Sequence, residues 1–229
     1  MITTSTTLIS EEDLKTLENI FKERLKNPVI LMAFITHNNC EYCNEEAQLV
    51  NELTKANSLI KAEVINIDDD SKTPSKFNID KAPAISIMGD NYKDYRVRYF
   101  GLPAGHEFSA FIDDVIDISN DKSRLSPSGK ARTKAISQPA RIEVYVTPTC
   151  PYCPRAVRMA HQMAIENPLI TGDMVEAMEF PDLADKYQVM SVPKMIINGT
   201  YHFVGALPEP QFIEQVELAL KGAAPPEDE

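Results

Sequence analysis

The 229-residue sequence contains no apolar run that approaches the ~20 residues needed for a membrane-spanning helix, so no membrane association is expected. Residues 1–7 lack the basic and long apolar regions of a secretory signal peptide. We therefore expect a cytoplasmic location. Basic side chains are in the minority, with 23 Lys and Arg against 34 Asp and Glu, and the net charge of −11 argues against a nucleic-acid partner.

Cysteine is scarce, and its four copies fall into two C-x-x-C pairs, Cys40 with Cys43 and Cys150 with Cys153. No cysteine is left over to build a framework of structural disulfides. In a cytosolic chain, such pairs are typical of metal-binding or redox sites rather than of structural cross-links.

The C-terminal pair lies at a predicted strand-to-helix turn. An alternating apolar run at residues 142–146 predicts a buried strand before it. Apolar residues at helical spacing follow the pair, at Ala156, Val157, Ala160, Met163 and Ala164. Cys150 is therefore expected at or near a helix N-terminus, where unpaired N–H groups and the helix dipole stabilise a thiolate. This pattern indicates a dithiol oxidoreductase.

The second half of the chain repeats the first. Cys40 and Cys150 are 110 residues apart (150 − 40), and so are Pro83 and Pro193 (193 − 83). Each half is predicted to run β-α-β-α-β-β-α after an initial helix, with its first two strands parallel and its last two antiparallel. The strands of the second half are expected at residues 142–146, 174–180, 194–197 and 201–204.

Residues 119–139 are the predicted join between the halves. Ser126 as N-cap and Pro127 at the first helical position predict a helix through Ile136. We therefore expect an N-terminal unit at residues 1–118 and a C-terminal unit at residues 119–229, the latter including this linker helix and an acidic tail. Because the join is short and structured, the two sheets are expected to be joined or tightly packed.

This order of elements, with a C-x-x-C at the start of the first crossover helix and a proline just before the third strand, resembles the thioredoxin fold. That likeness implies an α/β protein of two tandem thioredoxin-fold units, each a mixed sheet with flanking helices. Residues 142–153 resemble a glutaredoxin active site. Two such units, with CEYC and CPYC sites in matching registers, resemble the protein disulfide oxidoreductases, or glutaredoxin-like proteins, of thermophilic archaea and bacteria.

The resemblance implies dithiol–disulfide exchange on protein substrates, as reduction, oxidation or isomerisation. It implies that Cys40 and Cys150 are the nucleophiles and that Cys43 and Cys153 resolve the mixed disulfides. It also implies that electrons come from a thioredoxin-reductase-type flavoprotein and that the chain itself needs no metal or organic cofactor.

The resemblance further implies cis peptide bonds at Ala82–Pro83 and Val192–Pro193, facing the two dithiols. Such a proline would present the backbone of the preceding residue to an extended substrate, which pairs with it as an added strand. Its ring, which lacks an N–H, would also give the thiols a rigid apolar wall.

Three other side chains are candidates for roles near the thiols. Tyr42 and Tyr152 are expected to pack beside them, either as walls or as hydrogen-bonding groups. Glu143 has two interpretations: a buried proton acceptor for Cys153, with a raised pKa, or an exposed or edge carboxylate. The four histidines show no metal-ligand spacing and are taken as structural or surface residues; they are His37, His106, His161 and His202.

Two other functions remain open at this point. The four cysteines suit a zinc site in number, although 106 residues separate the pairs, whereas the pairs of zinc ribbons usually lie some 15–20 residues apart. Paired thioredoxin units also suit a non-enzymatic chaperone or scaffold that binds peptides, but such binding needs no reactive thiols. Glutathione is not the expected substrate, because residues 203–207 replace the Gly-Gly-acidic stretch that holds it in glutaredoxins.

Local charge predicts that Cys150 is more reactive than Cys40. Negative charge beside a thiol raises its pKa, and positive charge lowers it, so more thiolate is expected at Cys150. The acidic neighbours of Cys40 are Glu41, Glu45 and Glu46, and the basic neighbours of Cys150 are Arg155 and Arg158.

Overall fold

The computed structural model describes residues 7–70 and 72–226. The expectations for residues 1–6 and for the end of the acidic tail, 227–229, lie outside this range. Within the described ranges, no helix has both the length and the apolar character needed to cross a membrane.

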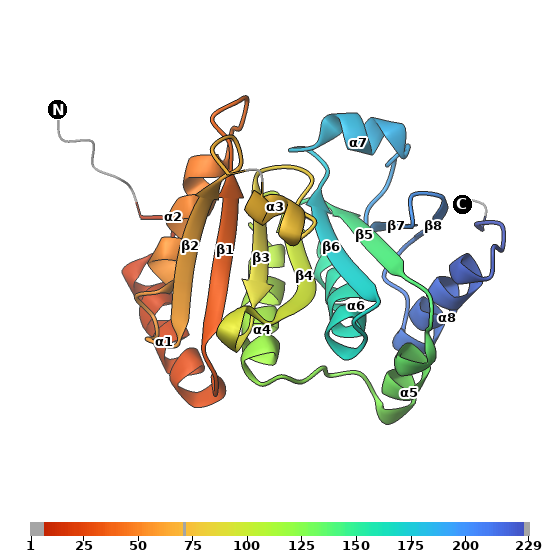
Figure 1. The fold of residues 1–229 in the computed structure, drawn as a ribbon, viewed down its shortest axis with the longest axis horizontal. Coiled ribbons are helices and arrows are strands. Elements are labelled where there is room, and N and C mark those ends of the chain that lie inside the picture. Colours follow the sequence, from red (N-terminus) through yellow and green to blue (C-terminus); the bar gives the residue numbers. More distant parts are fainter. Residues whose placement is uncertain (1–6, 71, 227–229) are drawn as a thin grey trace.

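One eight-stranded mixed sheet forms the centre of the molecule, in the order β2-β1-β3-β4-β6-β5-β7-β8 (Figure 1). Its N-terminal half consists of β1 (Val29–Ile35), β2 (Ile60–Asn66), β3 (Ala84–Met88) and β4 (Asp94–Phe100). Its C-terminal half consists of β5 (Ala140–Val146), β6 (Ile170–Glu176), β7 (Lys194–Ile197) and β8 (Tyr201–Val204). In each half the first two strands pair in parallel and the last two pair antiparallel, as predicted.

Helices connect and flank these strands, and the predicted N-cap at Ser126 is confirmed. The Ser10 side chain accepts a hydrogen bond from the Asp13 N–H, and Ser126 accepts one from the Gly129 N–H. The helices are α1 (Glu11–Arg24), α2 (Cys43–Leu53), α3 (Lys72–Lys76), α4 (Glu107–Ser119), α5 (Pro127–Ala135), α6 (Cys153–Glu166), α7 (Pro181–Lys186) and α8 (Glu209–Leu220), with a short 3-10 turn at η1 (Asp90–Tyr92).

The two halves are joined through their sheets, which confirms that prediction. Strand β4 pairs in parallel with β6, with Val97 opposite Gly172 and Phe100 opposite Val175. Behind this junction α4 packs against α6, and Asp114 on α4 forms an ion pair with Arg158 on α6. The two halves therefore behave as neighbours in one sheet rather than as tethered domains.

The two faces of the sheet carry separate apolar cores, because strand side chains alternate between faces. Leu31 and Ile142 belong to the core beneath the helices α1, α2, α4, α6 and α8, which also contains Cys153. Met32 and Tyr145, an odd number of residues further along the same strands, belong to the second core, on the side of α3 and α7. The face on which a strand residue lies therefore decides whether it can reach the dithiol helices.

Strand β6 starts four residues earlier than expected, at Ile170 rather than at residue 174, so that prediction was wrong. The reason is Gly172, at which a Cβ atom would lie 2.8 Å from both the backbone carbon and the oxygen of Ala160 in α6. A glycine inside a strand often marks such a close approach of a second backbone, although in sequence it suggests a turn. The predicted end of the strand, residues 177–180, is a turn in which the Phe180 N–H donates to the Glu176 carbonyl oxygen.

Both C-x-x-C pairs lie at the same edge of the sheet. Strands β1, β4, β6 and β5 all run in the same direction, so their carboxyl ends share one edge. Four inter-strand steps lie between β1 and β5, which separates these two strands by about 19 Å at ~4.8 Å per step.

Candidate active site

In the C-terminal site, Cys150 and Cys153 form a disulfide at the start of α6. The Cys153 N–H donates to the Cys150 Sγ at 3.2 Å, so the helix N-terminus is directed at this sulfur. Cys153 is fully buried, whereas the Cys150 Sγ lies 3.8 Å from the carbonyl oxygen of Val192. Val192 precedes Pro193, so the sulfur faces the loop that the sequence predicted to face it.

The N-terminal site has the same strand, turn and helix, but the loop between the strand and the first cysteine is longer. Cys40 and Cys43 form a disulfide, Cys43 opens α2, and the Thr36 N–H donates to the Cys43 Sγ at 3.3 Å. Four residues separate β1 from Cys40, whereas three separate β5 from Cys150. The additional loop residue leads to a left-handed Asn39, with φ of 49°, and Cys40 is half-buried. The strict 110-residue repeat of the cysteines therefore conceals an insertion just before Cys40.

The peptide bonds Ala82–Pro83 and Val192–Pro193 are both cis, as predicted. Each of these loops is tied to the end of the unit's last strand. The Gly101 N–H donates to the Pro83 carbonyl oxygen at 3.0 Å, and the Gly205 N–H donates to the Pro193 carbonyl oxygen at 2.9 Å.

The middle tyrosines of the two sites differ in exposure. Tyr152 is 70% exposed and Tyr42 is 36% exposed. The charge of Glu41, with burial and further carboxylates, raises the pKa of Tyr42. The surroundings of the N-terminal site are therefore acidic even at the tyrosine.

The two pairs do not converge on one point. A structural zinc ion bonds all four thiolates at ~2.3 Å, which two pairs that follow strands about 19 Å apart in one sheet do not provide. Each pair instead closes its own disulfide. The described residues also contain no other cluster of His, Cys, Asp and Glu suited to a metal ion.

A carboxyl group that sequence reasoning missed lies beside the C-terminal site. Helices α4 and α6 both start at the carboxyl edge of the sheet and run side by side in parallel, with Asp114 on α4 contacting Arg158 and His161 on α6. Two helical turns earlier, Glu107 on α4 therefore stands opposite the start of α6, where Cys153 lies.

Glu107 is buried, and neither of its carboxyl oxygens has a hydrogen-bond partner among the described residues. Burial, with a contribution from the charge of Asp114, raises the pKa of Glu107 to about 8. Its position is held from the neighbouring unit, because the His106 N–H donates to the Pro148 carbonyl oxygen at 3.1 Å. This contact joins α4 directly to the loop that carries Cys150.

The N-terminal site faces carboxyl groups that come from the other unit. Glu179, in the loop between β6 and α7, accepts a hydrogen bond from the Leu102 N–H at 2.8 Å. Burial raises the pKa of Glu179 to about 7, and the charges of Glu176, Glu41 and Glu45 act in the same direction. Each unit therefore contributes an acid beside its neighbour's dithiol.

Glu143 is buried and burial raises its pKa, as the first interpretation expected, but it does not face the dithiol. It is buried within the central strand β5, but it points to the face opposite Cys153, since Ile142 and Val144 occupy the dithiol face. Its carboxylate lies 4.0 Å from the charged groups of Lys81 and Arg141. The role of proton acceptor for Cys153 is therefore wrong, and so is the exposed or edge position.

Two charges invoked for the unequal sites also need correction. Arg158 forms ion pairs with Asp114 and Asp117, so its positive charge is compensated. Glu46 is completely buried, and burial raises its pKa well above the usual carboxyl range, so it adds less negative charge than expected. Glu41 and Arg155 are exposed and keep the predicted signs of charge at their sites.

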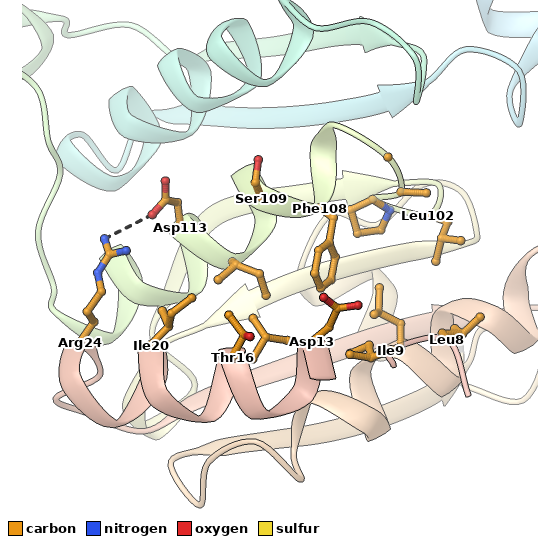
Figure 2. A pocket seen from close by; sticks show the side chains of 16 residues that line it. Leu8, Ile9, Asp13, Thr16, Ile20, Arg24, Leu102, Phe108, Ser109 and Asp113 are labelled. Atoms are coloured by element: carbon orange, nitrogen blue, oxygen red, sulfur yellow. Dashed lines mark hydrogen bonds and ion pairs between the residues drawn. The ribbon is translucent and has the colours of Figure 1, made fainter. Parts of the chain in front are cut away.

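A separate cavity of about 650 Å³ lies between α1 and α4 (Figure 2). Its lining is mostly apolar, and an ion pair between Arg24 and Asp113 crosses one end. The described lining residues include no cysteine, so this cavity is distinct from both dithiols.

Comparison with known proteins agrees with this geometry. A thioredoxin domain family model matches residues 140–217. The solved structure of a protein disulfide oxidoreductase from Aeropyrum pernix k1 is 35% identical, with a TM-score of 0.86, and the match covers 94% of this chain and 95% of that chain. The chain belongs to the protein disulfide oxidoreductase family. Membership in this family, together with the two C-x-x-C disulfides, supports thiol–disulfide exchange as its chemistry.

Two further relatives carry names from electron transfer. A solved structure of an alkylhydroperoxide reductase component from Enterococcus faecalis is 26% identical, with a TM-score of 0.83, over 91% of this chain and 99% of that chain. An NADH dehydrogenase from Ferdinandcohnia aciditolerans is 22% identical over 91% of this chain, but over only 37% of its own length. The chain thus spans little more than a third of the curated relatives it matches first.

Proposed function

We propose that this protein passes electron pairs between a flavoprotein reductase and protein disulfides, with Cys40 and Cys150 as nucleophiles and Cys43 and Cys153 as resolving thiols. The observation that carries this proposal is the contrast within the C-terminal pair. Cys150 retains 8% of its surface and faces the Val192 carbonyl at 3.8 Å next to an exposed Tyr152, whereas Cys153 retains none. This difference supports Cys150 as the sulfur that a protein substrate meets first.

The reductive cycle starts when the Cys150 thiolate attacks one sulfur of a substrate disulfide. A mixed disulfide forms and one substrate thiolate leaves. The Cys153 thiolate then attacks Cys150, which releases the second substrate thiolate and closes the Cys150–Cys153 disulfide. Two electrons have moved to the substrate, and its two thiolates take up protons. Run in reverse, the same steps oxidise a dithiol.

Glu107 is the proposed proton donor and acceptor for Cys153. A carboxyl group with a pKa of about 8 is mostly protonated at neutral pH, so it protonates the Cys153 thiolate when the disulfide opens. Glu107→Gln is expected to slow the opening of Cys150–Cys153 by dithiothreitol about 10-fold or more at pH 7, and to remove the fall in rate near pH 8. An unchanged pH profile contradicts this role.

The electron donor proposed for the oxidised protein is a thioredoxin-reductase-type flavoprotein. This proposal is supported by the relatives named NADH dehydrogenase and alkylhydroperoxide reductase, which share this pair of units. The substrates proposed are protein disulfides, and the units proposed are residues 1–118 and 119–229. The cytoplasmic location remains a prediction.

Reduction of insulin by dithiothreitol tests the function. The wild-type protein is expected to accelerate insulin precipitation, and a variant with all four cysteines changed to serine is expected to lose this effect entirely. A peptide-binding chaperone predicts the opposite for the variant, because it delays aggregation with or without thiols. Equal effects of the two proteins therefore contradict the proposed function.

A further inference from the structure

Glu46 lies on the same face of α2 as the resolving Cys43. Helix α2 begins at Cys43, and Glu46 follows three residues later, which is the spacing of neighbours on a helix surface. Side chains in a helix lean toward its N-terminus, so the Glu46 carboxyl group is directed back to the turn that holds Cys43. The Cys43 sulfur is fixed in this turn by the Thr36 N–H.

The carboxyl group of Glu46 has no exposed surface, and both of its oxygens lack a hydrogen-bond partner among the described residues. A buried carboxylate without partners is costly, so the neutral acid is favoured, and burial is the main cause of its raised pKa. Glu52 on the same helix shows the contrast. It is also buried, but it accepts hydrogen bonds from the Leu8 and Ile9 N–H groups, and its pKa is lowered.

No carboxyl group stands at the matching place in the C-terminal site. Cys153 opens α6 as Cys43 opens α2, and the residue three positions later is Ala156. The acid of the C-terminal site is Glu107, which comes from a different helix of the other unit. The repeated fold therefore does not require an acid at the position of Glu46. In the N-terminal unit, this position supplies an acid to the dithiol that lies away from Glu107.

We propose that Glu46 is the proton donor and acceptor of the N-terminal dithiol, acting on Cys43. This inference rests on the proposed function. When an external thiolate attacks Cys40, the Cys40–Cys43 bond breaks, a bond from Cys40 to the attacking sulfur forms, and Cys43 leaves as a thiolate. The proton of the Glu46 acid passes to this thiolate. On closure the Glu46 carboxylate takes the proton back, Cys43 attacks Cys40, and the external thiolate departs.

The C-terminal unit adjusts this proton transfer through Glu179. Burial is the first cause of the raised pKa of Glu46, and the charge of ionised Glu179, which is anchored by the Leu102 N–H, is the second. The other titratable groups acting on this region are Glu41, Tyr42, Glu45 and Glu176, none of which is basic. Negative charge from both units therefore favours the protonated form of Glu46 while the Cys40–Cys43 disulfide is closed.

The test isolates the N-terminal dithiol in a background in which Cys150 and Cys153 are changed to serine. Opening of Cys40–Cys43 by dithiothreitol is then measured from pH 5 to 9, with rates divided by the thiolate concentration of the reagent. In the Glu46→Gln variant, the Cys40–Cys43 disulfide is expected to open about 10-fold or more slowly at pH 7. The break in the pH profile, the change of slope at the pKa of Glu46, is expected to be lost. Glu179→Gln is expected to move this break to lower pH.

Glu45→Gln is the matched control, since it makes the same side-chain substitution one residue earlier on the same helix. It is expected to keep the break in the pH profile. Rates and profiles of Glu46→Gln within twofold of Glu45→Gln overturn the inference while leaving the proposed function intact. If Cys40–Cys43 opens in none of these proteins, the proposed function fails at this site.

A second variant and measurements at the C-terminal dithiol distinguish a loss of proton transfer from a folding defect. Glu46→Met buries no polar group and is expected to stay folded, as judged by circular dichroism, while it loses the same break. In the reverse background, with Cys40 and Cys43 changed to serine, Glu46→Gln is expected to leave the opening of Cys150–Cys153 unchanged. An equal slowing at both sites shows a general structural effect and overturns the proposal.

Discussion

The N-terminal and C-terminal dithiols share a strand, a turn and a helix start, yet they differ in their proposed proton donors and in local charge. The acid proposed for Cys153 is Glu107, on α4 of the neighbouring unit, and the acid proposed for Cys43 is Glu46, on the same helix. The loop before Cys40 is one residue longer, and the exposed Glu41 follows it. Helix N-termini are common to both sites, so any difference in reactivity must come from these neighbours.

The sites are also too far apart for direct exchange. A disulfide transfers electrons only when a third sulfur reaches bonding contact, and the two pairs follow strands that lie about 19 Å apart in one sheet. Any electron transfer between the two sites therefore requires an external thiol or a second molecule. Two unlike sites on one edge can thus serve two different partners.

The largest expected effect comes from removing one nucleophile at a time. Cys150→Ser is expected to remove most of the insulin reductase activity, and Cys40→Ser to leave much of it, because Glu41 opposes the Cys40 thiolate and Arg155 favours that of Cys150. The pH dependence of alkylation checks the cause. A lower thiol pKa at Cys40 than at Cys150 contradicts the charge argument.

The next effect is on stability. The pKa of Glu107 is raised to about 8 in the folded protein, so folding favours its protonated form. The unfolded chain releases this proton near pH 4.5, and the native state therefore loses stability as pH rises from about 4.5 to 8, by up to about 5 kcal/mol. Glu107→Gln is expected to flatten this dependence and to raise the free energy of unfolding at pH 8.

Urea unfolding of the oxidised protein at pH 5 and pH 8 measures this difference. Glu217→Gln is a suitable control, since Glu217 is paired with Arg132 near the surface and its pKa is lowered. A Glu107→Gln variant with the wild-type pH dependence shows that other buried acids, such as Glu179 and Glu46, dominate the linkage. In that case, the pH dependence of the free energy of unfolding comes mainly from the acids near the N-terminal site.

The smallest effect concerns the two tyrosines. Tyr152 is 70% exposed beside Cys150 and offers its ring to a bound substrate, whereas Tyr42 is 36% exposed. Tyr152→Ala is expected to raise the KM for a protein disulfide about two- to fivefold with little change in kcat. Tyr42→Ala is expected to change it less, and a larger effect at Tyr42 assigns substrate binding to the N-terminal site.

Local patterns were sufficient for the plan of the molecule. Hydrophobic period, turn residues and the two N-caps, Ser10 and Ser126, determine the elements, because these signals act over a few residues. The repeat determined that both cysteine pairs start helices and that Pro83 and Pro193 occupy equivalent loops. The strand placed wrongly, β6, contains Gly172. A glycine is needed there because the backbone of Ala160, in another element, lies too close for a side chain.

Tertiary structure decided which charges reach the thiols. Glu107 lies 46 residues before Cys153 in sequence (153 − 107), and nothing local marks it as part of that site. Glu143 looked close but faces the other side of the sheet, and Arg158 looked free but is paired with Asp114 and Asp117. The sequence by itself determined where the sulfurs are, since their geometry depends on adjacent residues. The proton affinity around them depends on burial and on charges from distant segments, which only the folded chain brings together.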